Sequence, residues 1–296
     1  MIAATKIALS TYVTDIYAVF RNIAEDSVYQ LKRSADVYEL WAAARPEDVR
    51  HVATITDASL SRFLMDRRGV YSEAYLRKIR GDLLTLLRAA ADDGLCSAPQ
   101  KVRPIAKPKP KPRAWPIEDV EKIVRSCYDY RGKSRTGFDL RTYFAGITMT
   151  AWDTSLRKED LHSISQAMIA DSGRITITQN KTDEEQYCRV SAETLRVLRS
   201  IGREYPLAWP GCDDQFYYHW RRIVKAAGVK YLGGMHALRK SAATEVARVQ
   251  PGAETRFLGH TTPIADRHYI DRSLIADNAV TPTALKVVSS SQKMLF

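Results

Sequence analysis

The chain has 296 residues, which is enough for two domains of ordinary size and too many for a single mini-domain. Hydrophobic residues make up 45% and charged residues 27%, a globular composition that excludes extended disorder. Lys and Arg outnumber Asp and Glu by 45 to 34, which gives a net charge of +11 and a pI near 9.5. This surplus favours a polyanionic partner.

The sequence also predicts the compartment. No apolar stretch approaches the ~18 residues that cross a bilayer, and polar residues interrupt the N-terminal apolar stretch where a secretory signal requires an unbroken one. The cysteines are scattered and predict neither a zinc ribbon nor a disulfide framework. They are Cys96, Cys127, Cys188 and Cys212. We therefore expect an intracellular protein with reduced thiols and no membrane partner.

Residues 1–98 are expected to form a bundle of about four helices. Apolar residues recur at three- and four-residue steps over 72–93, with Ser72 as the N-cap and Gly94 at the C-terminal stop. Three other segments show a weaker form of this pattern: 7–23, 27–43 and 58–67. The bundle is close to neutral, with about 13 basic and about 13 acidic side chains.

Residues 99–116 form a basic segment in which Lys or Arg alternates with Pro. Its cations carry roughly +6, more than half of the net charge. They are Lys101, Arg103, Lys107, Lys109, Lys111 and Arg113. Because proline lacks a backbone donor and favours extended geometry, we expect an extended linker between two domains. Its cations are candidate phosphate contacts, and a solvated spacer is the alternative interpretation.

Residues 117–272 are expected to form a second, mostly helical domain. Pro116 and the acidic residues after it predict a helix start at 117. A β-hairpin is predicted from the β-branched alternation at 174–178 and the segment 187–190. Further helices are expected at 138–152, 191–201, 213–227, 237–249 and 265–269. The predicted fold class is therefore mainly α (α+β), with a small antiparallel sheet.

Six residues of this domain form a recognisable constellation. Near its end the chain reads GGMHALRKSAATEVARV and then RFLGHTTPIADRHYID, and TSLRKEDL and NKTDE lie upstream. His236 and Arg239 are three apart on one predicted helix, so they share a face. Nine residues separate His260 from Tyr269. The six residues are Arg157, Lys181, His236, Arg239, His260 and Tyr269.

The order and spacing of these six residues resemble the tyrosine recombinase (phage integrase) family. The N-terminal bundle and basic linker are similar to the family's core-binding part. The resemblance implies that Arg157 and Arg239 hold the scissile phosphate and that Tyr269 attacks it. The sequence departs from the family pattern at three positions: Ser155 replaces the usual Gly, Asp160 the common Glu, and Lys240 a second His.

Elementary chemistry supports these roles. Guanidinium groups bind phosphate oxygens bidentately and stay protonated, so two arginines suit a transition state that gains negative charge. A free tyrosine has a pKa of about 10 and needs a proton acceptor at neutral pH. His236 is the candidate base and His260 a candidate hydrogen-bond donor to the phosphate. Lys181 on the hairpin is the candidate acid for the leaving 5′-hydroxyl.

The function predicted from these residues is site-specific DNA recombination through a covalent 3′-phosphotyrosyl intermediate. The resemblance implies a homotetramer on double-stranded DNA that carries a specific core site, with a Holliday junction as an intermediate. We expect no metal, no cofactor and no ATP requirement, and a cytoplasmic protein associated with the nucleoid. The tail, residues 273–296, has an apolar end that either docks on a neighbouring subunit or frays.

Other interpretations stay open at this point. Taken singly, each of the six residues is typical of a surface ion pair, a core aromatic or a helix histidine. His236, His260 and His268 are alternative zinc ligands, although their spacing matches no common site. A type IB topoisomerase and a catalytically silent DNA-binding protein are the alternative functions. The first would relax supercoiled DNA without pairing two sites, and the second would form no covalent adduct.

Overall fold

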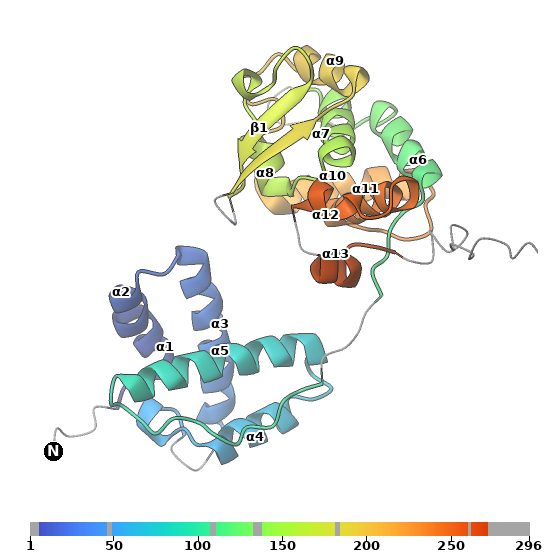
Figure 1. The fold of residues 1–296 in the computed structure, drawn as a ribbon. Coiled ribbons are helices and arrows are strands. Elements are labelled where there is room, and N and C mark those ends of the chain that lie inside the picture. The colour runs from blue at the N-terminus through green and yellow to red at the C-terminus, as the bar shows by residue number, and fades with distance from the viewer. Residues whose placement is uncertain are drawn as a thin grey trace, which may run out of the picture. The chain divides into compact units, whose positions relative to one another are not determined.

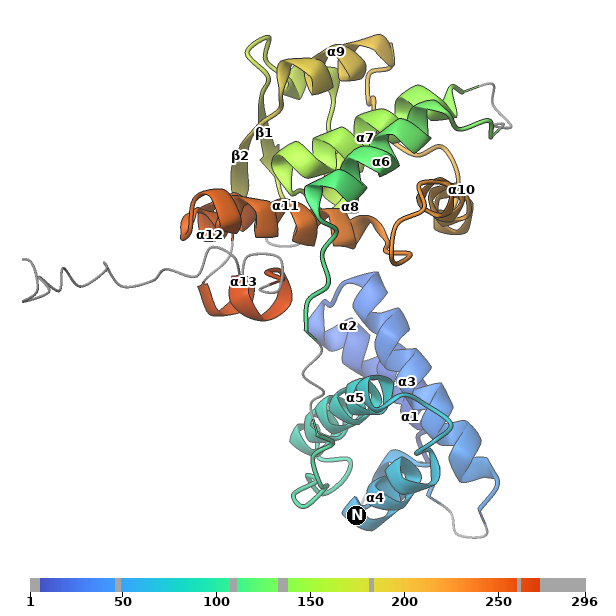
Figure 2. The same ribbon diagram turned by 90° about the vertical axis from the view of Figure 1, so that its right-hand side faces the viewer.

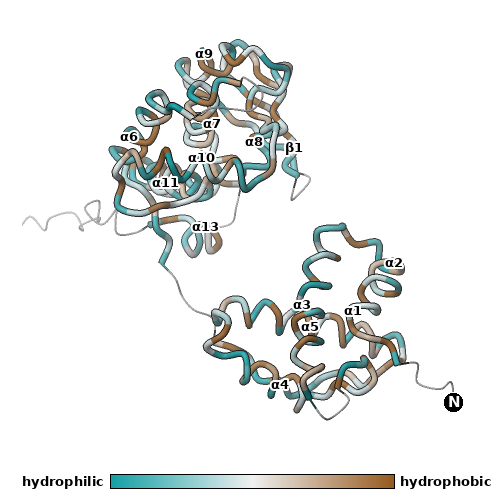
Figure 3. The backbone as a smooth tube through the Cα atoms, turned by 180° about the vertical axis from the view of Figure 1, so that it is seen from behind, coloured by the Kyte–Doolittle hydropathy of each residue, from teal (hydrophilic) through white to brown (hydrophobic). Residues whose placement is uncertain are grey.

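The computed structural model of the protein describes residues 6–45, 49–106, 111–132, 138–180, 184–259 and 262–271. The chain divides into two compact units, Met1–Pro110 and Lys111–Phe296. The boundary falls inside the basic segment that the sequence predicts to be a linker. Hydrophobic and hydrophilic residues alternate along the helices of both units (Figure 3), as expected where each helix buries one face.

The first unit is a helical bundle (Figure 1). Its helices are α1 Leu9–Tyr12, α2 Ala18–Arg21, α3 Glu25–Ala43, α4 Asp57–Asp66 and α5 Glu73–Asp92, with a π-helical turn at Val13–Tyr17 and a 3-10 turn at Val52–Thr54. The Ser72 side chain accepts a hydrogen bond from the Tyr75 amide and caps α5, as predicted. The rings of Tyr38, Trp41 and Phe63 lie 5.3–5.5 Å apart and form an aromatic centre in the core.

The start of the basic segment is packed onto this first unit. The guanidinium of Arg80 donates to the carbonyls of Val102 and Arg103, at 2.6 and 2.8 Å. The Asp57 carboxylate accepts from the backbone amide of Lys101 at 2.8 Å. Val102 is itself buried in the core. Residues up to 106 are therefore held in place, although they form no regular secondary structure.

The second unit is mostly helical with one small sheet (Figures 1 and 2). Its helices are α6 Ile117–Tyr128, α7 Leu140–Thr154, α8 Lys158–Ser163, α9 Ala192–Ser200, α10 Asp213–Ala226, α11 Met235–Val249, α12 Ala253–Leu258 and α13 Thr262–His268, with a 3-10 turn at Gln166–Met168. Apolar and small residues surround α7 on most faces, and it packs against α6, α9 and α11 at the centre of the unit. The predicted fold class is confirmed.

The sheet is the predicted β-hairpin. Strands β1 Arg174–Thr178 and β2 Glu185–Arg189 pair antiparallel, from Arg174 opposite Arg189 to Thr178 opposite Glu185. Ile175 and Ile177 point into the core, as the alternation predicts. The sequence did not predict α8 and α12, because a helix of six residues is too short to show a hydrophobic period.

Ser155, at the C-terminal end of α7, adopts a left-handed backbone conformation with φ +54°. Its side chain is buried, and its hydroxyl has no hydrogen-bond partner among the described residues. Left-handed geometry costs a non-glycine residue about 1 kcal/mol. We therefore expect Ser155→Gly to raise the free energy of unfolding by about 1 kcal/mol in chemical denaturation.

Ser200→Gly is the matched control. Ser200 ends α9 and is exposed, so the same change there should lower stability by about 0.5–1 kcal/mol. A loss of stability in Ser155→Gly would show that the packing of the serine side chain outweighs its backbone strain.

Candidate active site

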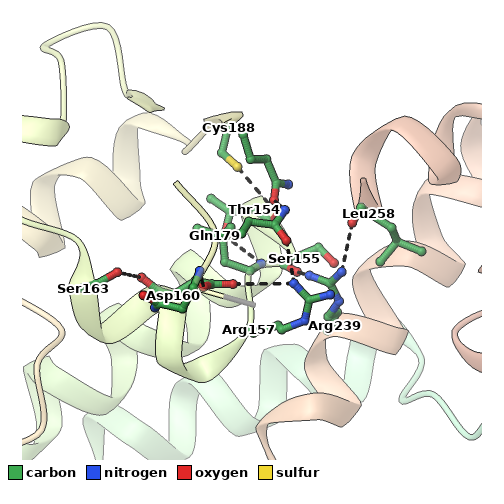
Figure 4. A network of polar contacts seen from close by, with 12 residues as sticks. Thr154, Ser155, Arg157, Asp160, Ser163, Gln179, Cys188, Arg239 and Leu258 are labelled. Atoms are coloured by element: carbon green, nitrogen blue, oxygen red, sulfur yellow. Dashed lines mark hydrogen bonds and ion pairs between the residues drawn. The ribbon is translucent and has the colours of Figure 1, made fainter. Parts of the chain in front are cut away.

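Helix α11 places His236 and Arg239 on one face, as their spacing predicts. Arg239 is only 1% exposed. Its guanidinium donates to the carbonyl of Ser155 and, at 2.9 Å, to the carbonyl of Leu258 (Figure 4). Helices α7 and α12 therefore hold this arginine from two sides by their last carbonyls. Such a fixed guanidinium loses little entropy on binding a phosphate.

Tyr269 follows directly after α13 and lies against the same face of α11. Its ring centroid is 5.4 Å from that of His236, and the Cζ of Arg239 is 5.1 Å from it. The tyrosine is 8% exposed and belongs to a small apolar cluster formed by α11, α12 and α13. The cluster also contains Ala243, Ala247, Leu258, Ala265 and Ile270. Helix α13 lies next to α12 in both ribbon views (Figures 1 and 2).

Arg157 enters the site from the residue before α8. Its Nη1 donates to Oε1 of Gln179 at 2.6 Å and lies 3.8 Å from Oδ2 of Asp160. Asp160 is buried, and its Oδ1 accepts from the backbone amide of Asn180 at 2.9 Å. Asn180 immediately precedes Lys181 in the hairpin turn. Asp160 therefore connects the arginine to the strand end that leads to the predicted lysine (Figure 4).

The site is positively charged. Burial lowers the pKa of Arg239, the nearby Arg157 lowers it further, and the charge of Tyr269 and a hydrogen bond with it raise it. The guanidinium nevertheless stays protonated, because its ordinary pKa lies above 12. Two cations that repel each other next to a tyrosine form a favourable place for an anion. The geometry thus suits a phosphate held between Arg157 and Arg239.

Solved structures with this arrangement of elements are known. A lambda integrase dimer bound to a COC' core site matches with a TM-score of 0.71 and 18% identity, over 91% of this chain and 79% of that chain. XerH site-specific recombinase bound to palindromic difH substrate matches with a TM-score of 0.67 and 18% identity, over 91% and 83%. Tn1549 transposon integrase in complex with a circular intermediate DNA gives a TM-score of 0.67 at 10% identity, over 88% and 95%.

The chain has the tyrosine recombinase fold. No family model and no curated protein matches the sequence. The resemblance seen in the motifs is therefore confirmed at the level of the fold. The tyrosine recombinase fold also brings together four of the six predicted residues, although they are spread over 113 positions of the chain from Arg157 to Tyr269.

The remaining two predicted catalytic residues, Lys181 and His260, lie outside the described residues. Of the six linker cations, Lys107 and Lys109 also lie outside them. The other four are exposed: Lys101, Arg103, Lys111 and Arg113. The predicted tail, residues 273–296, is not described either. Gly259, the residue before His260, has φ +64° and ends α12.

Sequence reasoning missed two glutamines that connect the parts of the site. Gln179 binds Arg157 and donates to the side chain of Gln186, which in turn donates to the carbonyl of Phe257 in α12 at 3.4 Å. A signal was present, because Gln179 continues the inward alternation of Ile175 and Ile177. A polar residue at an inward strand position is typical of a buried hydrogen-bond network.

Within the described residues, no group of three or more His, Cys, Asp or Glu side chains is arranged to hold a metal ion. The zinc alternative therefore gains no support from these residues. In the same part of the chain, none of the helices has both the length and the apolar character needed to cross a bilayer.

His236 is exposed at the first turn of α11, and its pKa is lowered to about 4. Desolvation is the largest cause, followed by the positive charges of Lys240, Arg239 and Arg157. We expect its imidazole to be neutral at pH 6 in the free protein and to titrate near 4, as measured by NMR. Because the folded pKa lies below the unfolded value, the contribution of His236 to stability should fall as the pH decreases from about 6.5 towards 4.

Lys240→Met is the informative comparison for this titration. It removes the cation that contributes most to the shift after burial, so the pKa of His236 should rise. A His236 midpoint at or above 6.5 in the free protein would contradict this electrostatic picture. His236→Asn assigns the signal.

Proposed function

We propose that the protein is a site-specific DNA recombinase that breaks and rejoins DNA through a covalent bond between Tyr269 and a 3′-phosphate. The observation that carries the proposal is the meeting of a tyrosine, a neutral histidine and two fixed guanidinium groups at one place. A phosphate that binds the two arginines comes within reach of the tyrosine.

Each described residue has a definite part in the proposed reaction. Arg157 and Arg239 neutralise the charge that the phosphate gains in the transition state. Their guanidinium groups supply the charge that a metal ion supplies in other phosphoryl-transfer sites. Tyr269 attacks the phosphorus, the bond to the 5′-oxygen breaks, and the phosphotyrosyl bond replaces it. His236 takes the phenolic proton, because its low pKa keeps it neutral and able to accept.

The proposed roles of Lys181 and His260 complete the site. Lys181 protonates the leaving 5′-oxygen, and His260 donates a hydrogen bond to the phosphate. The contact of Asp160 with the Asn180 amide supports the first role, since it holds the strand end before the lysine. In the reverse reaction a DNA 5′-hydroxyl attacks the phosphotyrosyl bond, so rejoining needs no ATP.

The partner is double-stranded DNA with a specific core site. The basic segment 99–116 is proposed to follow the phosphate backbone with its exposed cations. Strand exchange through a Holliday junction requires a homotetramer on two sites, and the apolar end of the tail is proposed to dock on a neighbouring subunit. The comparison structures of lambda integrase include a tetramer bound to a Holliday junction, and this supports the proposed assembly.

A type IB topoisomerase activity is the second candidate, because the same residues would cleave and rejoin one strand. A supercoiled plasmid that carries no second site separates the two. A topoisomerase relaxes it, whereas a recombinase needs two sites to exchange strands. The helical first unit favours the recombinase, since it has the fold of the DNA-bound recombinases.

Capture of covalent adducts tests the proposal and finds the target sequence at the same time. The protein is incubated with sheared total DNA of its source organism without added metal or ATP, and DNA that stays attached after denaturation is sequenced. We expect one recurrent sequence with inverted repeats. No adduct would leave a silent DNA-binding protein, and an adduct that requires a divalent metal would contradict the mechanism.

A further inference from the structure

Three segments of the second unit meet on the face of α11 that follows Arg239. The first is Ala114–Trp115, where the basic segment enters this unit. The second is α11 itself, through Ser241 and Thr244. The third is Tyr269–Asp271, the end of the segment that carries the proposed nucleophile. We call the five residues Ala114, Trp115, Ser241, Thr244 and Asp271 the α11 joint.

The side chains of α11 bind both other segments. The Oγ of Ser241 accepts from the backbone amide of Trp115 at 2.7 Å. The Oγ1 of Thr244 accepts from the amide of Asp271 at 3.0 Å and donates to the carbonyl of Tyr269 at 3.4 Å. Ser241 and Thr244 are three residues apart, so they lie on one face of the helix. Backbone groups of both segments are therefore fixed to one rigid element.

Trp115 fastens its segment firmly. Its side chain is 1% exposed, stacks on Tyr231 at a centroid distance of 5.1 Å, and donates from Nε1 to the Tyr231 carbonyl at 3.1 Å. A Cβ at Gly233 would come within 2.8 Å of the indole ring, so this close approach requires glycine. Gly233 lies two residues before α11, so the tryptophan also packs next to the start of the helix that carries His236.

Asp271 closes the connection between the two segments. Its Oδ2 accepts from the backbone amide of Ala114 at 3.1 Å, across 157 positions of the chain. The same residue is two positions after Tyr269, and its own amide is held by Thr244. A hydrogen bond to a charged acceptor is about twice as strong as a neutral one. Asp271 therefore ties the segment of the nucleophile directly to the entry point of the linker.

We propose that Asp271 is a positioning residue, which sets the place of Tyr269 by holding its segment to Ala114 in the α11 joint. A change in the position of the linker entry, as when DNA binds, is then transmitted to the tyrosine. The effect on cleavage rests on the proposed function, because misplacing a nucleophile by about 1 Å costs on the order of 100-fold in rate. The tie itself does not depend on that function.

The first measurement is amide hydrogen exchange in the free full-length protein. Asp271→Ala should raise the exchange rates of the Ala114 and Tyr269 amides by about tenfold, as expected for loss of a charge-assisted hydrogen bond. Asp271→Asn keeps an acceptor oxygen and should restore most of the protection. Unchanged exchange at both amides in Asp271→Ala would overturn the proposal, whether or not the protein cleaves DNA.

The second measurement is single-turnover cleavage of a nicked duplex built on the captured site, at saturating protein. Asp271→Ala should slow cleavage about tenfold while the Kd for the duplex changes less than about twofold, and Asp271→Asn should recover most of the rate. Equal losses in both variants would overturn the positioning role. Absence of cleavage by the unmodified protein would reject the proposed function and leave the exchange result to decide the tie.

Asp57→Ala is the matched control. The Asp57 carboxylate also binds linker amides, those of Gln100 and Lys101, but in the first unit. Its loss frees the other end of the basic segment without touching the α11 joint. Exchange at Tyr269 should therefore stay unchanged in Asp57→Ala. A rise equal to that of Asp271→Ala would show a general loosening of the protein and overturn the specific tie.

Discussion

Replacing Tyr269 by phenylalanine is expected to abolish the covalent protein–DNA adduct. The change removes one oxygen atom, the proposed attacking atom, and keeps the ring that packs against α11 and α12. Because no other nucleophile is proposed to replace it, the rate of adduct formation should fall by at least about 10⁴-fold. The measurement is a denaturing gel of the protein with a nicked duplex that traps the cleaved product.

DNA binding provides the internal control for this variant. The Kd of Tyr269→Phe for the same duplex should stay within about threefold of the unmodified value, because the linker cations and the two arginines are retained. Tyr205→Phe, at an exposed tyrosine of the same unit, should form adduct at the normal rate. An adduct that persists in Tyr269→Phe would reject the assignment of the nucleophile.

The second large effect is expected at Arg239. Replacement by lysine keeps the positive charge but loses the planar fork that binds two oxygens. We expect cleavage to slow by about 10²- to 10³-fold, comparable to the loss of one preorganised donor to a transition-state oxyanion. Single-turnover cleavage at saturating protein measures this, because saturation separates the chemical step from binding.

Arg239→Ala should lower stability as well. It leaves the buried carbonyls of Ser155 and Leu258 without their guanidinium donor, at a cost of about 1–3 kcal/mol in the free energy of unfolding. Arg248→Ala, on the exposed face of the same helix and paired with Glu245, should change stability by less than about 0.5 kcal/mol and leave cleavage intact. Equal effects at the two arginines would contradict the proposed role of Arg239.

The burial of Arg239 explains a feature of the chain that a motif alone does not. An arginine with 1% exposure is expensive to bury unless its donors are satisfied and its charge has a use. Here carbonyls satisfy two donors, and burial together with Arg157 lowers its pKa. A bound phosphate would relieve the repulsion between the two arginines. We infer that the site is electrostatically poised for an anion.

The sequence by itself determined the helices, the hairpin and four converging residues of the site. These features depend on local patterns: the three- and four-residue period of 72–93, the alternation of 174–178, and the short spacing from His236 to Arg239. It also placed the domain boundary within 99–116, because proline and charge are local properties, and the two compact units meet inside that segment.

Only the tertiary structure decided how these pieces hold one another. The carbonyl of Ser155 that binds Arg239 is 84 positions away in the chain, and Ser241 is 126 positions from the Trp115 amide that it holds. Such hydrogen bonds join backbone groups, which every residue has, so no side-chain pattern announces them. Local chemistry therefore named the reacting groups, while packing over long sequence distances fixed where Tyr269 stands and what ties it there.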